Sequence, residues 1–392
     1  MSAENKVPAI RFEGFRGEWA ERKIGEIADT TIGEFVIRTK QNPNSQYPVF
    51  NGGKSYTGFY DEYNNEGNKI VISARGANAG YVNIQKGRFW AGNSCYSVGI
   101  KDQSNFDTDF IYYVIKRSQS QFTDYQQAAN IPSVSKNDVE VFQMVCPKYN
   151  EQTEIGNYFQ QLDTLIAQHQ QKHDKLLNLK KALLEKMFPK QGANVPEIRF
   201  KGFSGEWEEK QLGDLADIVR GASPRPIEDP KWFDKSSDVG WLRIRDVTEQ
   251  DGRIYHLEQR ISKLGEEKTR VLTESHLLLS IAASVGKPVI NYVNTGVHDG
   301  FLIFKKPSFD LEYMFQWLKS FEAKWQQYGQ PGSQVNLNSD IVKRQEVFMP
   351  KPEEQTQIGN LFKQLDTLIN QHQAQLKKLN NIKQACLEKM FV

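Results

Sequence analysis

The sequence has few cysteines and no long hydrophobic run. Its 392 residues include three cysteines, Cys95, Cys146 and Cys386, which lie far apart and lack the spacing of a metal site. A reduced cytoplasmic protein is the simplest interpretation. No window approaches about 18 apolar residues, so no membrane span is expected. The first residues, MSAENKVPAI, lack the charged-then-apolar layout of a signal peptide.

The sequence also lacks an excess of one charge. Lys and Arg together number 50, Asp and Glu number 48, and the net charge is +2. A strongly basic chain would indicate a nucleic acid or a membrane as partner. The near balance gives no such indication, so any argument for nucleic acid must come from other features. The length allows two or three domains, and 39% hydrophobic residues are ordinary for a globular protein.

Motifs for nucleotide binding and methyl transfer are incomplete. Residues 53–55 read Gly-Lys-Ser, like the end of a phosphate-binding loop, but Pro48 stands where that motif requires a glycine. Adenine methyltransferases carry an N-P-P-Y/F or D-P-P-Y/F motif, and the sequence contains neither, since residues 42–44 read Asn-Pro-Asn. No site for a nucleotide or a methyl donor is therefore predicted on this chain.

Two possible metal sites are also weak. His169 and His173 are four residues apart, a spacing that can hold a metal on a helix, but a repeat described below replaces the second with Leu376. Glu266 and Lys268 resemble part of a nuclease site, but their polar surroundings are not strand-like. The sequence predicts no catalytic residue, no metal site and no cofactor bound by this chain.

What the sequence does contain is a long segment written twice. Residues Glu151–Phe188 and Glu354–Phe391 are identical at roughly two thirds of their positions, and both begin with EQTxIG and end with LEKMF. Such similarity indicates an internal repeat. Each copy predicts a helix of roughly 55 Å at 1.5 Å per residue. Asn150 is a candidate cap for the first helix, and Pro189 follows its predicted end.

Each predicted helix carries an apolar seam. Its positions alternate in steps of four and three, the a and d pattern of a coiled coil. The nearest partner for each seam is the other copy, so we predict an intramolecular pair; the alternative is two amphipathic helices packed on separate domains. Polar seam positions that recur in both copies, such as His169 with His372 and Lys180 with Lys383, suit a pair of fixed register. The predicted seam consists of Ile155, Phe159, Leu162, Ile166, His169, Leu176, Leu183, Ile358, Phe362, Leu365, Ile369, His372, Leu376, Leu379 and Cys386.

A shorter repeat precedes each variable part of the chain. The first tag, Val7–Trp19, reads VPAIRFEGFRGEW, and the second tag, Val195–Trp207, reads VPEIRFKGFSGEW. The order is therefore tag, variable block and helix, twice. The aromatic residues of the tags are expected to dock on a common surface. A closed arrangement would bring the end of the second helix to the first tag and give an approximate two-fold axis.

Two variable blocks, residues 20–147 and 208–350, lie between the tags and the helices. Both are expected to be compact mixed α/β domains. The predicted domains are residues 1–150, 151–188, 189–353 and 354–392. Expected strands are Lys69–Ser73, Leu277–Ile281, Trp241–Val247 and Gly296–Phe304, and expected helices are Asp109–Arg117 and Leu311–Gln327.

This organisation resembles the DNA specificity subunit of Type I restriction–modification systems. The resemblance covers nearly the whole chain and depends on the order of the parts, their lengths and the duplicated EQTxIG…LEKMF helices. It implies an α/β (α+β) fold in which two target-recognition domains are joined by two long helices forming an intramolecular antiparallel coiled coil. Each domain would read one half of an asymmetric bipartite DNA site, and the helices would set the distance between the halves.

The resemblance also implies partners. The subunit would itself be non-catalytic and would assemble with two modification subunits, which methylate adenine with S-adenosylmethionine, and two restriction subunits, which use ATP; magnesium is likewise expected on the partners. The alternative is a coiled-coil protein-interaction scaffold without enzymatic activity. A DNA-specificity subunit should bind a split site with steep salt dependence, whereas a scaffold should show no sequence preference.

Candidate DNA contacts lie on glycine-rich loops of both blocks. Arg, Asn and Gln side chains suit base edges, and Lys and Ser commonly bind phosphates. The alternative for each of them is an ordinary solvated turn residue. The candidates are Lys54, Ser55, Arg75, Asn78, Asn93, Arg220, Ser223, Arg225, Ser284, Lys287, Ser333, Gln334 and Asn336.

Overall fold

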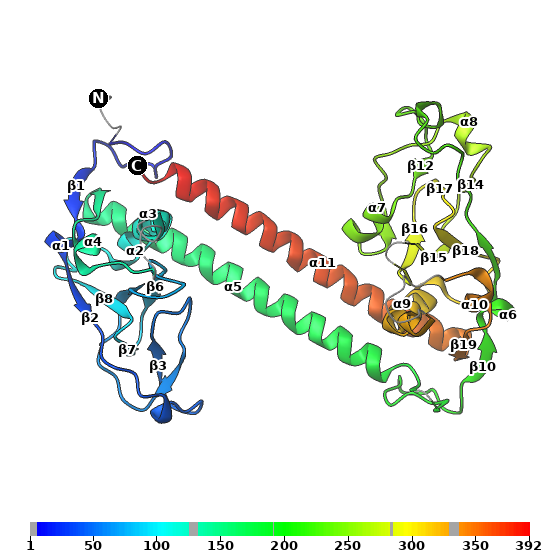
Figure 1. Cartoon of the computed structure of the whole chain (residues 1–392), viewed down its shortest axis with the longest axis horizontal. Helices are drawn as coiled ribbons and strands as arrows, with labels where there is room; N and C mark the ends of the chain where they lie inside the picture. The colour runs from blue at the N-terminus through cyan, green and yellow to red at the C-terminus, as the bar shows by residue number, and fades with distance from the viewer. Residues whose placement is uncertain (1–5, 125–131, 191, 283–284, 329–336) are drawn as a thin grey trace. The chain divides into compact units, whose positions relative to one another are not determined.

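The computed structural model describes residues 6–124, 132–190, 192–282, 285–328 and 337–392 (Figure 1). They form two compact units, described separately below. Unit 1 comprises Met1–Gln171 and Gln373–Val392, and unit 2 comprises Lys172–His372. Each unit therefore contains one tag, one variable block, the first half of one long helix and the last half of the other.

Unit 1 is built on a four-stranded antiparallel sheet of order β2-β8-β5-β6. A three-stranded sheet, β4-β3-β7, and the antiparallel pair β1-β9 complete it. Its elements are β1 (Ala20–Lys23), α1 (Ile24–Ile27), β2 (Ala28–Ile32), η1 (Arg38–Lys40), β3 (Tyr47–Phe50), β4 (Gly58–Tyr60), β5 (Lys69–Ser73), β6 (Val82–Gln85), β7 (Trp90–Ala91), β8 (Cys95–Ile100), α2 (Thr108–Arg117), α3 (Gln119–Asp124), α4 (Lys136–Glu140), β9 (Gln143–Cys146) and α5 (Tyr149–Lys186), the last of which continues into unit 2.

Unit 2 repeats this plan with one more strand in its main sheet. The order is β11-β18-β15-β16-β13, next to a three-stranded sheet β12-β17-β14 and the pair β10-β19. Its elements are β10 (Glu208–Gln211), α6 (Leu212–Leu215), β11 (Asp217–Arg220), η3 (Pro230–Trp232), β12 (Gly240–Trp241), α7 (Ile244–Glu249), β13 (Arg253–Ile254), α8 (Lys263–Glu266), β14 (Arg270–Leu272), β15 (Leu277–Ser280), β16 (Pro288–Asn291), β17 (Thr295–Val297), β18 (Phe301–Lys305), α9 (Leu311–Phe321), η4 (Glu322–Tyr328), α10 (Ser339–Lys343), β19 (Glu346–Met349) and α11 (Pro352–Lys389), which continues into unit 1. The predicted mixed α/β character of both blocks is confirmed.

The tags close each unit on a helix end, as the repeat order predicts. In unit 1, Ile10 N donates a hydrogen bond of 2.8 Å to Lys389 O in the last turn of α11. Figure 1 shows this turn, in red, beside the dark-blue first tag. In unit 2, Ile198 N donates 2.9 Å to Lys186 O at the end of α5. The end of the second helix thus meets the first tag.

The glutamate of EQTxIG binds the arginine of the tag. Arg199 Nε and Nη2 donate to the two carboxylate oxygens of Glu354 at 2.6 and 2.7 Å, and the Glu354 side chain is fully buried. Arg11 and Glu151 form the same pair in unit 1 at 2.5 and 2.6 Å. A buried carboxylate is stable only with such charged donors. These pairs explain why the tag and the helix start recur together in the sequence.

The glutamine and glycine of EQTxIG position the helix of each block. Gln152 Oε1 accepts from Asp107 N, the N-cap of α2, at 3.0 Å, and Gln355 does the same for Asp310, the N-cap of α9, at 2.9 Å. A Cβ on Gly156 would lie 2.6 Å from the carboxylate oxygen of Asp107 that accepts from Phe110 N, so a larger residue there would disturb the cap of α2. The motif therefore attaches each block to its long helix.

The long helices begin and end close to the predicted bounds. Asn150 lies inside the first turn of α5, which begins at Tyr149, so the prediction of Asn150 as its cap is wrong. In unit 1, Tyr158 OH lies 3.6 Å from Cys386 Sγ, and the rings of Phe159 and Phe391 are 5.4 Å apart. Asp163, further along α5, faces Lys383, which precedes Cys386 in α11, so the first half of α5 and the last half of α11 run in opposite directions in this unit.

The predicted seam positions are the less exposed stripe of each long helix. In unit 1, Ile155, Phe159 and Leu162 are buried with Met390 and Phe391. The remaining ones are buried or half-buried, whereas most residues between them are exposed, with Lys180 and Asp366 among the buried exceptions. These remaining positions are Ile166, His169, Leu176, Leu183, Ile358, Phe362, Leu365, Ile369, His372, Leu376, Leu379 and Cys386.

Lys180 and Lys383, predicted as matching polar positions, each face an aspartate. Lys383 Nζ donates 2.5 Å to Asp163 in unit 1, and Lys180 Nζ donates 2.5 Å to Asp366 in unit 2. These aspartates stand in the QLDTL part of the repeat and were not among the residues selected from the sequence.

Strand predictions hold for the central strands and fail elsewhere. Lys69–Ser73 is β5. The expected strand Leu277–Ile281 is β15, which ends one residue earlier, at Ser280. The expected helix Asp109–Arg117 lies within α2. The expected strand Gly296–Phe304 is two strands in different sheets, β17 and β18. The expected helix Leu311–Gln327 turns from α9 into the 3-10 helix η4 at Glu322.

Trp241–Val247, predicted as a half-exposed strand, is wrong beyond its first residue. The chain turns into α7 because Asp246 accepts from the backbone N of Arg243 at 2.8 Å and from its guanidinium at 2.8 and 3.1 Å. Val247 is then 2% exposed in the core. Local capping thus overrides the alternating pattern that favoured a strand.

Candidate nucleic-acid interface

Three loops of the first variable block meet at one end of its main sheet. They are residues 51–57, 74–80 and 92–94. Asn78 Nδ2 donates to Gly52 O at 3.4 Å, and Ser94 N donates to Asn51 Oδ1 at 3.2 Å. The Ser73 hydroxyl, at the end of β5, donates to Gly53 O at 3.1 Å. The glycine-rich loops selected from the sequence are therefore neighbours.

The candidate residues on these loops differ in exposure. Lys54, Ser55 and Arg75 are exposed, so their side chains are available to a ligand. Asn78 and Asn93 are half-buried. Asn78 also uses its amide to connect two loops, so part of its hydrogen-bonding capacity serves the fold.

In the second variable block, three candidates gather around Asp299. Arg220 Nε donates to the Asp299 backbone O at 2.6 Å. The Ser223 hydroxyl and Arg225 Nη2 donate to the two carboxylate oxygens of Asp299 at 2.7 and 2.6 Å. Asp299 lies in the turn between β17 and β18 and was not selected from the sequence, because a lone aspartate in a turn carries no signal of this kind.

The Asp299 carboxylate stays ionised. Burial raises the pKa of Asp299, but the Ser223 hydrogen bond and the positive charges of Arg225 and Arg220 outweigh this and hold its pKa below the usual value. Burial lowers the pKa of the neighbouring His298, although the charge of Asp299 opposes this. The turn therefore presents one negative charge covered by two arginines.

The loop that follows β2, the first core strand of unit 1, and the loop that follows β11, the first core strand of unit 2, are held by the same backbone hydrogen bonds. Gly33 N, after β2, donates to Cys95 O at 3.1 Å, and Gly221 N, after β11, donates to Phe301 O at 2.9 Å. A Cβ at either glycine would lie 2.2 or 2.1 Å from a backbone oxygen of the facing strand end. Both loops are thus forced along the same path.

The loops that follow β5 in unit 1 and β15 in unit 2, the second core strands, match as well. Ala74 N donates to Ser94 O, and Ile281 N donates to Gly300 O, each at 2.8 Å. By this register the turn residue Asn93 of unit 1 corresponds to Asp299 of unit 2. Lys287 lies at the far end of the second loop, directly before β16, and is half-buried. Ser284, Ser333, Gln334 and Asn336 lie outside the described residues.

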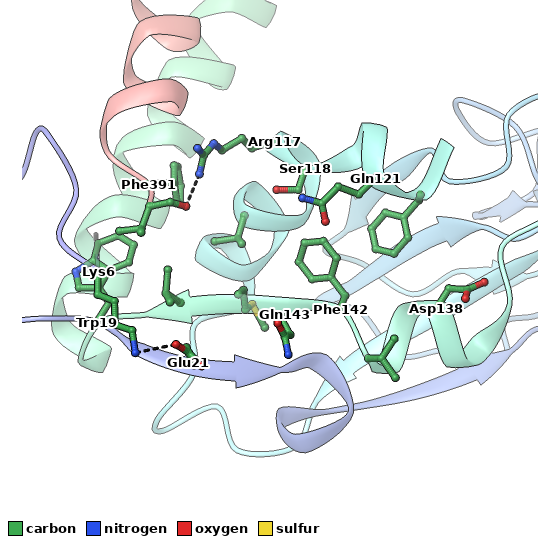
Figure 2. Close-up of a pocket in the computed structure, with 16 residues that line it drawn as sticks. Lys6, Trp19, Glu21, Arg117, Ser118, Gln121, Asp138, Phe142, Gln143 and Phe391 are labelled. Carbon is green, nitrogen blue, oxygen red and sulfur yellow. Dashed lines mark hydrogen bonds and ion pairs between the residues drawn. The ribbon is translucent and has the colours of Figure 1, made fainter. Parts of the chain in front are cut away.

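A pocket of about 690 Å³ lies elsewhere in unit 1 (Figure 2). The close-up shows Trp19, Ser118, Phe142 and Phe391 around it, and it is bordered by β1, β9 and the end of α2. None of the candidate DNA contacts lines this pocket. It is thus separate from the loop end of the block.

Unit 2 fills the corresponding space with its own side chains. Asp107 and Asp310 cap the equivalent helices α2 and α9, which places Trp317 and Phe321 where unit 1 has Val114 and Ser118. The two rings stack at 4.9 Å and are 7% and 8% exposed. The pocket of unit 1 follows from these two smaller residues.

Neither a metal site nor a membrane span is found among the described residues. No group of three or more His, Cys, Asp or Glu side chains in those ranges could hold a metal ion. No helix there is long and apolar enough to cross a membrane. All three cysteines are described and are free thiols.

Comparisons with known proteins agree with this duplicated architecture. The chain is 21% identical over 403 residues to the EcoDI specificity subunit of a Type I restriction enzyme from Escherichia coli, a match covering 95% of this chain and 88% of that protein. It is 23% identical over 204 residues to a protein of Mycoplasma genitalium assigned as a type I specificity subunit, covering 52% of this chain and 53% of that one. The chain thus spans about half the length of that relative, and 32% of a similar protein of Mycoplasma pneumoniae.

The fold is similar to a crystal structure of a Type-I restriction-modification system S subunit from M. genitalium. The TM-score is 0.73 at 18% identity, and the match covers 98% of this chain and 99% of that one. A family model for the Type I restriction modification DNA specificity domain matches residues 16–178 and 204–381. These two ranges make up most of the sequence, and the chain therefore belongs to the family of Type I restriction–modification DNA specificity proteins.

Proposed function

We propose that this chain is the non-catalytic specificity subunit of a Type I restriction–modification enzyme. Each variable block reads one half of an asymmetric split site on double-stranded DNA. The observation that carries this proposal is that the core-strand loops are held by the same backbone hydrogen bonds in both units but differ in chemistry, with Asn93 in one turn and Asp299 in the other. Two blocks that are built alike but carry different loop residues suit a DNA target whose two halves differ in sequence.

The long helices hold the two readers at a set distance as an antiparallel coiled coil. The opposite directions of α5 and α11 within unit 1, and the Lys–Asp pair in each unit, support this arrangement. A helical rod fixes the distance and the rotation between the two blocks, whereas a flexible linker would leave both variable. The helices also dock two modification subunits, which methylate adenine with S-adenosylmethionine, and two restriction subunits complete the enzyme with ATP and magnesium.

The decisive experiment uses the chain purified with its modification subunits. Sequencing the methylated adenines in DNA modified by the complex should reveal one recurring split sequence with unlike halves. A duplex carrying it should bind with affinity that falls steeply as salt rises. Binding without sequence preference at any salt would instead identify a protein-interaction scaffold.

Exchange and insertion variants separate the roles of blocks and helices. Replacing residues 20–147 with the block of another family member should change one half of the target and keep the other half and the gap. Inserting one helical turn into both α5 and α11 adds about 5.4 Å to each, which corresponds to one or two base pairs at about 3.4 Å each. The gap alone should change. A change in both halves after the block exchange would contradict modular reading.

A further inference from the structure

Three positions at the end of the first core strand (β2 in unit 1, β11 in unit 2) and in the loop after it differ completely in chemistry between the two units. The shared register of Gly33 and Gly221 sets the correspondence of the residues around them. In unit 1 these positions are apolar and 50%, 72% and 43% exposed, whereas in unit 2 they are the polar residues that surround Asp299. The corresponding pairs are Ile32 with Arg220, Phe35 with Ser223, and Ile37 with Arg225.

The apolar set of unit 1 lies beside the candidate DNA loops. Glu34 N donates to Ala91 O at 2.8 Å, which holds the loop against the strand that precedes the Asn93 turn. Three large apolar side chains remain exposed within six consecutive residues of the chain, and a concentration of exposed apolar side chains marks a contact surface. On a DNA base edge, the methyl group of thymine is the feature that apolar side chains contact in the major groove.

The polar set of unit 2 is held ready for a different base. Asp299 uses one donor of Arg225 and Nε of Arg220, and the Arg225 side chain remains 71% exposed. The remaining N–H groups of a guanidinium fork fit the O6 and N7 acceptors of guanine. Because Asp299 fixes the arginines before DNA arrives, less side-chain freedom is lost on binding.

We propose that this loop is a base-reading element in both blocks: Ile32, Phe35 and Ile37 contact a thymine methyl in one half-site, and Arg220 and Arg225, positioned by Asp299, contact a guanine in the other. This inference rests on the proposed function and adds to it the base class that each block reads. Arg220 and Arg225 are the contacts, and Asp299 acts through them as a positioning residue.

The thymine contact is tested with deoxyuridine, which lacks only the methyl group. The complex with its modification subunits is titrated with its split site, in which each thymine of the half read by the first block is replaced in turn. One replacement should weaken binding about fourfold, the value of one buried methyl group. The variant Phe35→Ala should bind the thymine and deoxyuridine duplexes equally. Val141→Ala, an equally apolar truncation of a residue that is 48% exposed beyond α4, should keep the wild-type ratio.

The guanine contact is tested with 7-deazaguanine, which lacks the N7 acceptor. One such replacement in the other half-site should weaken binding of the wild-type complex about tenfold, within the range of a bidentate arginine pair. Arg225→Ala should remove this difference, and Asp299→Asn should reduce it. Arg344→Ala removes an exposed arginine after α10 instead, and should weaken binding to both duplexes alike because it affects only the general charge.

The outcomes separate this inference from the proposed function. A complex that methylates no recurring split sequence refutes both. A complex with a clear split site that tolerates every deoxyuridine and 7-deazaguanine replacement keeps the proposed function and refutes this loop as the base-reading element. A half-site for the first block without thymine would refute the apolar contact directly.

Discussion

The ammonium group of Lys180 in α5 donates a hydrogen bond of 2.5 Å to the carboxylate of Asp366 in α11. Asp366 also accepts from Arg253 at 3.0 Å and from Gln316 of α9 at 2.9 Å. One buried aspartate thus connects both long helices to the second variable block. In unit 1, Asp163 accepts from Lys383 and from Tyr113 of α2, so the repeat contains the same connection twice.

Removing Asp366 should destabilise unit 2 more than removing Asp163 destabilises unit 1. Asp366→Ala leaves the buried Lys180 and Arg253 without a shared carboxylate, and breaking such a pair costs about 3–5 kcal/mol. Asp163→Ala should cost about 1 kcal/mol, because the Asp163 side chain is 37% exposed and water can replace it. Hydrogen exchange of α9 and α2 amides, followed by mass spectrometry, measures each unit separately. Equal losses in the two variants would contradict the role of burial.

Arg199→Lys should weaken the attachment of the second tag. Lysine cannot reproduce the paired hydrogen bonds to Glu354, whose side chain is fully buried. The expected loss in the free energy of unfolding is about 2 kcal/mol, measured by urea denaturation. Lys201→Ala, at an exposed position of the same tag, serves as control and should have almost no effect. A loss of similar size in both variants would show that the tag is sensitive to any change.

The pocket is open in unit 1 and filled by side chains in unit 2, so substitutions at equivalent places should change the free energy of unfolding differently. Trp317→Val in unit 2 should open a cavity and lower the free energy of unfolding by about 3 kcal/mol. Ser118→Phe in unit 1 should leave stability unchanged or raised, since about 690 Å³ is open beside it. Thermal unfolding of both variants gives the comparison. Strong destabilisation by Ser118→Phe would mean that the pocket cannot accept a ring.

Lys116 should make the stability of unit 1 rise with alkaline pH. Burial, and to a lesser extent the positive charge of Lys383, lower the pKa of Lys116 to about 8, although Asp163 opposes this. Between that value and the ordinary 10.5 the unfolded chain binds more protons than the folded one, so the free energy of unfolding increases with pH. Lys116→Met should lack this increase when denaturation is followed across the window. A slope equal to that of the wild type would assign the effect to other groups.

The long helices and central strands follow from local pattern, and the sequence alone was sufficient to predict them. The seam of α5 repeats every three or four residues, and β5 is a short apolar run bounded by turns. Such signals depend on near neighbours in the chain. The order of tags, blocks and helices likewise indicated both the family and the closure of each unit on a helix end.

Contacts between distant residues were decided only by the tertiary structure. Asp366 lies 113 residues from Arg253, and Asp299 lies 74 residues from Arg225, so no local spacing announces either group. The turn of Trp241–Val247 into α7 depended on one capping carboxylate at Asp246. Phe35 and Ser223 lie at the same distance from their tags in the sequence. That they occupy equivalent places in the two units became clear only from the matching backbone hydrogen bonds of Gly33 and Gly221. Periodicity records which face of an element is buried, whereas the partner on that face is set by packing.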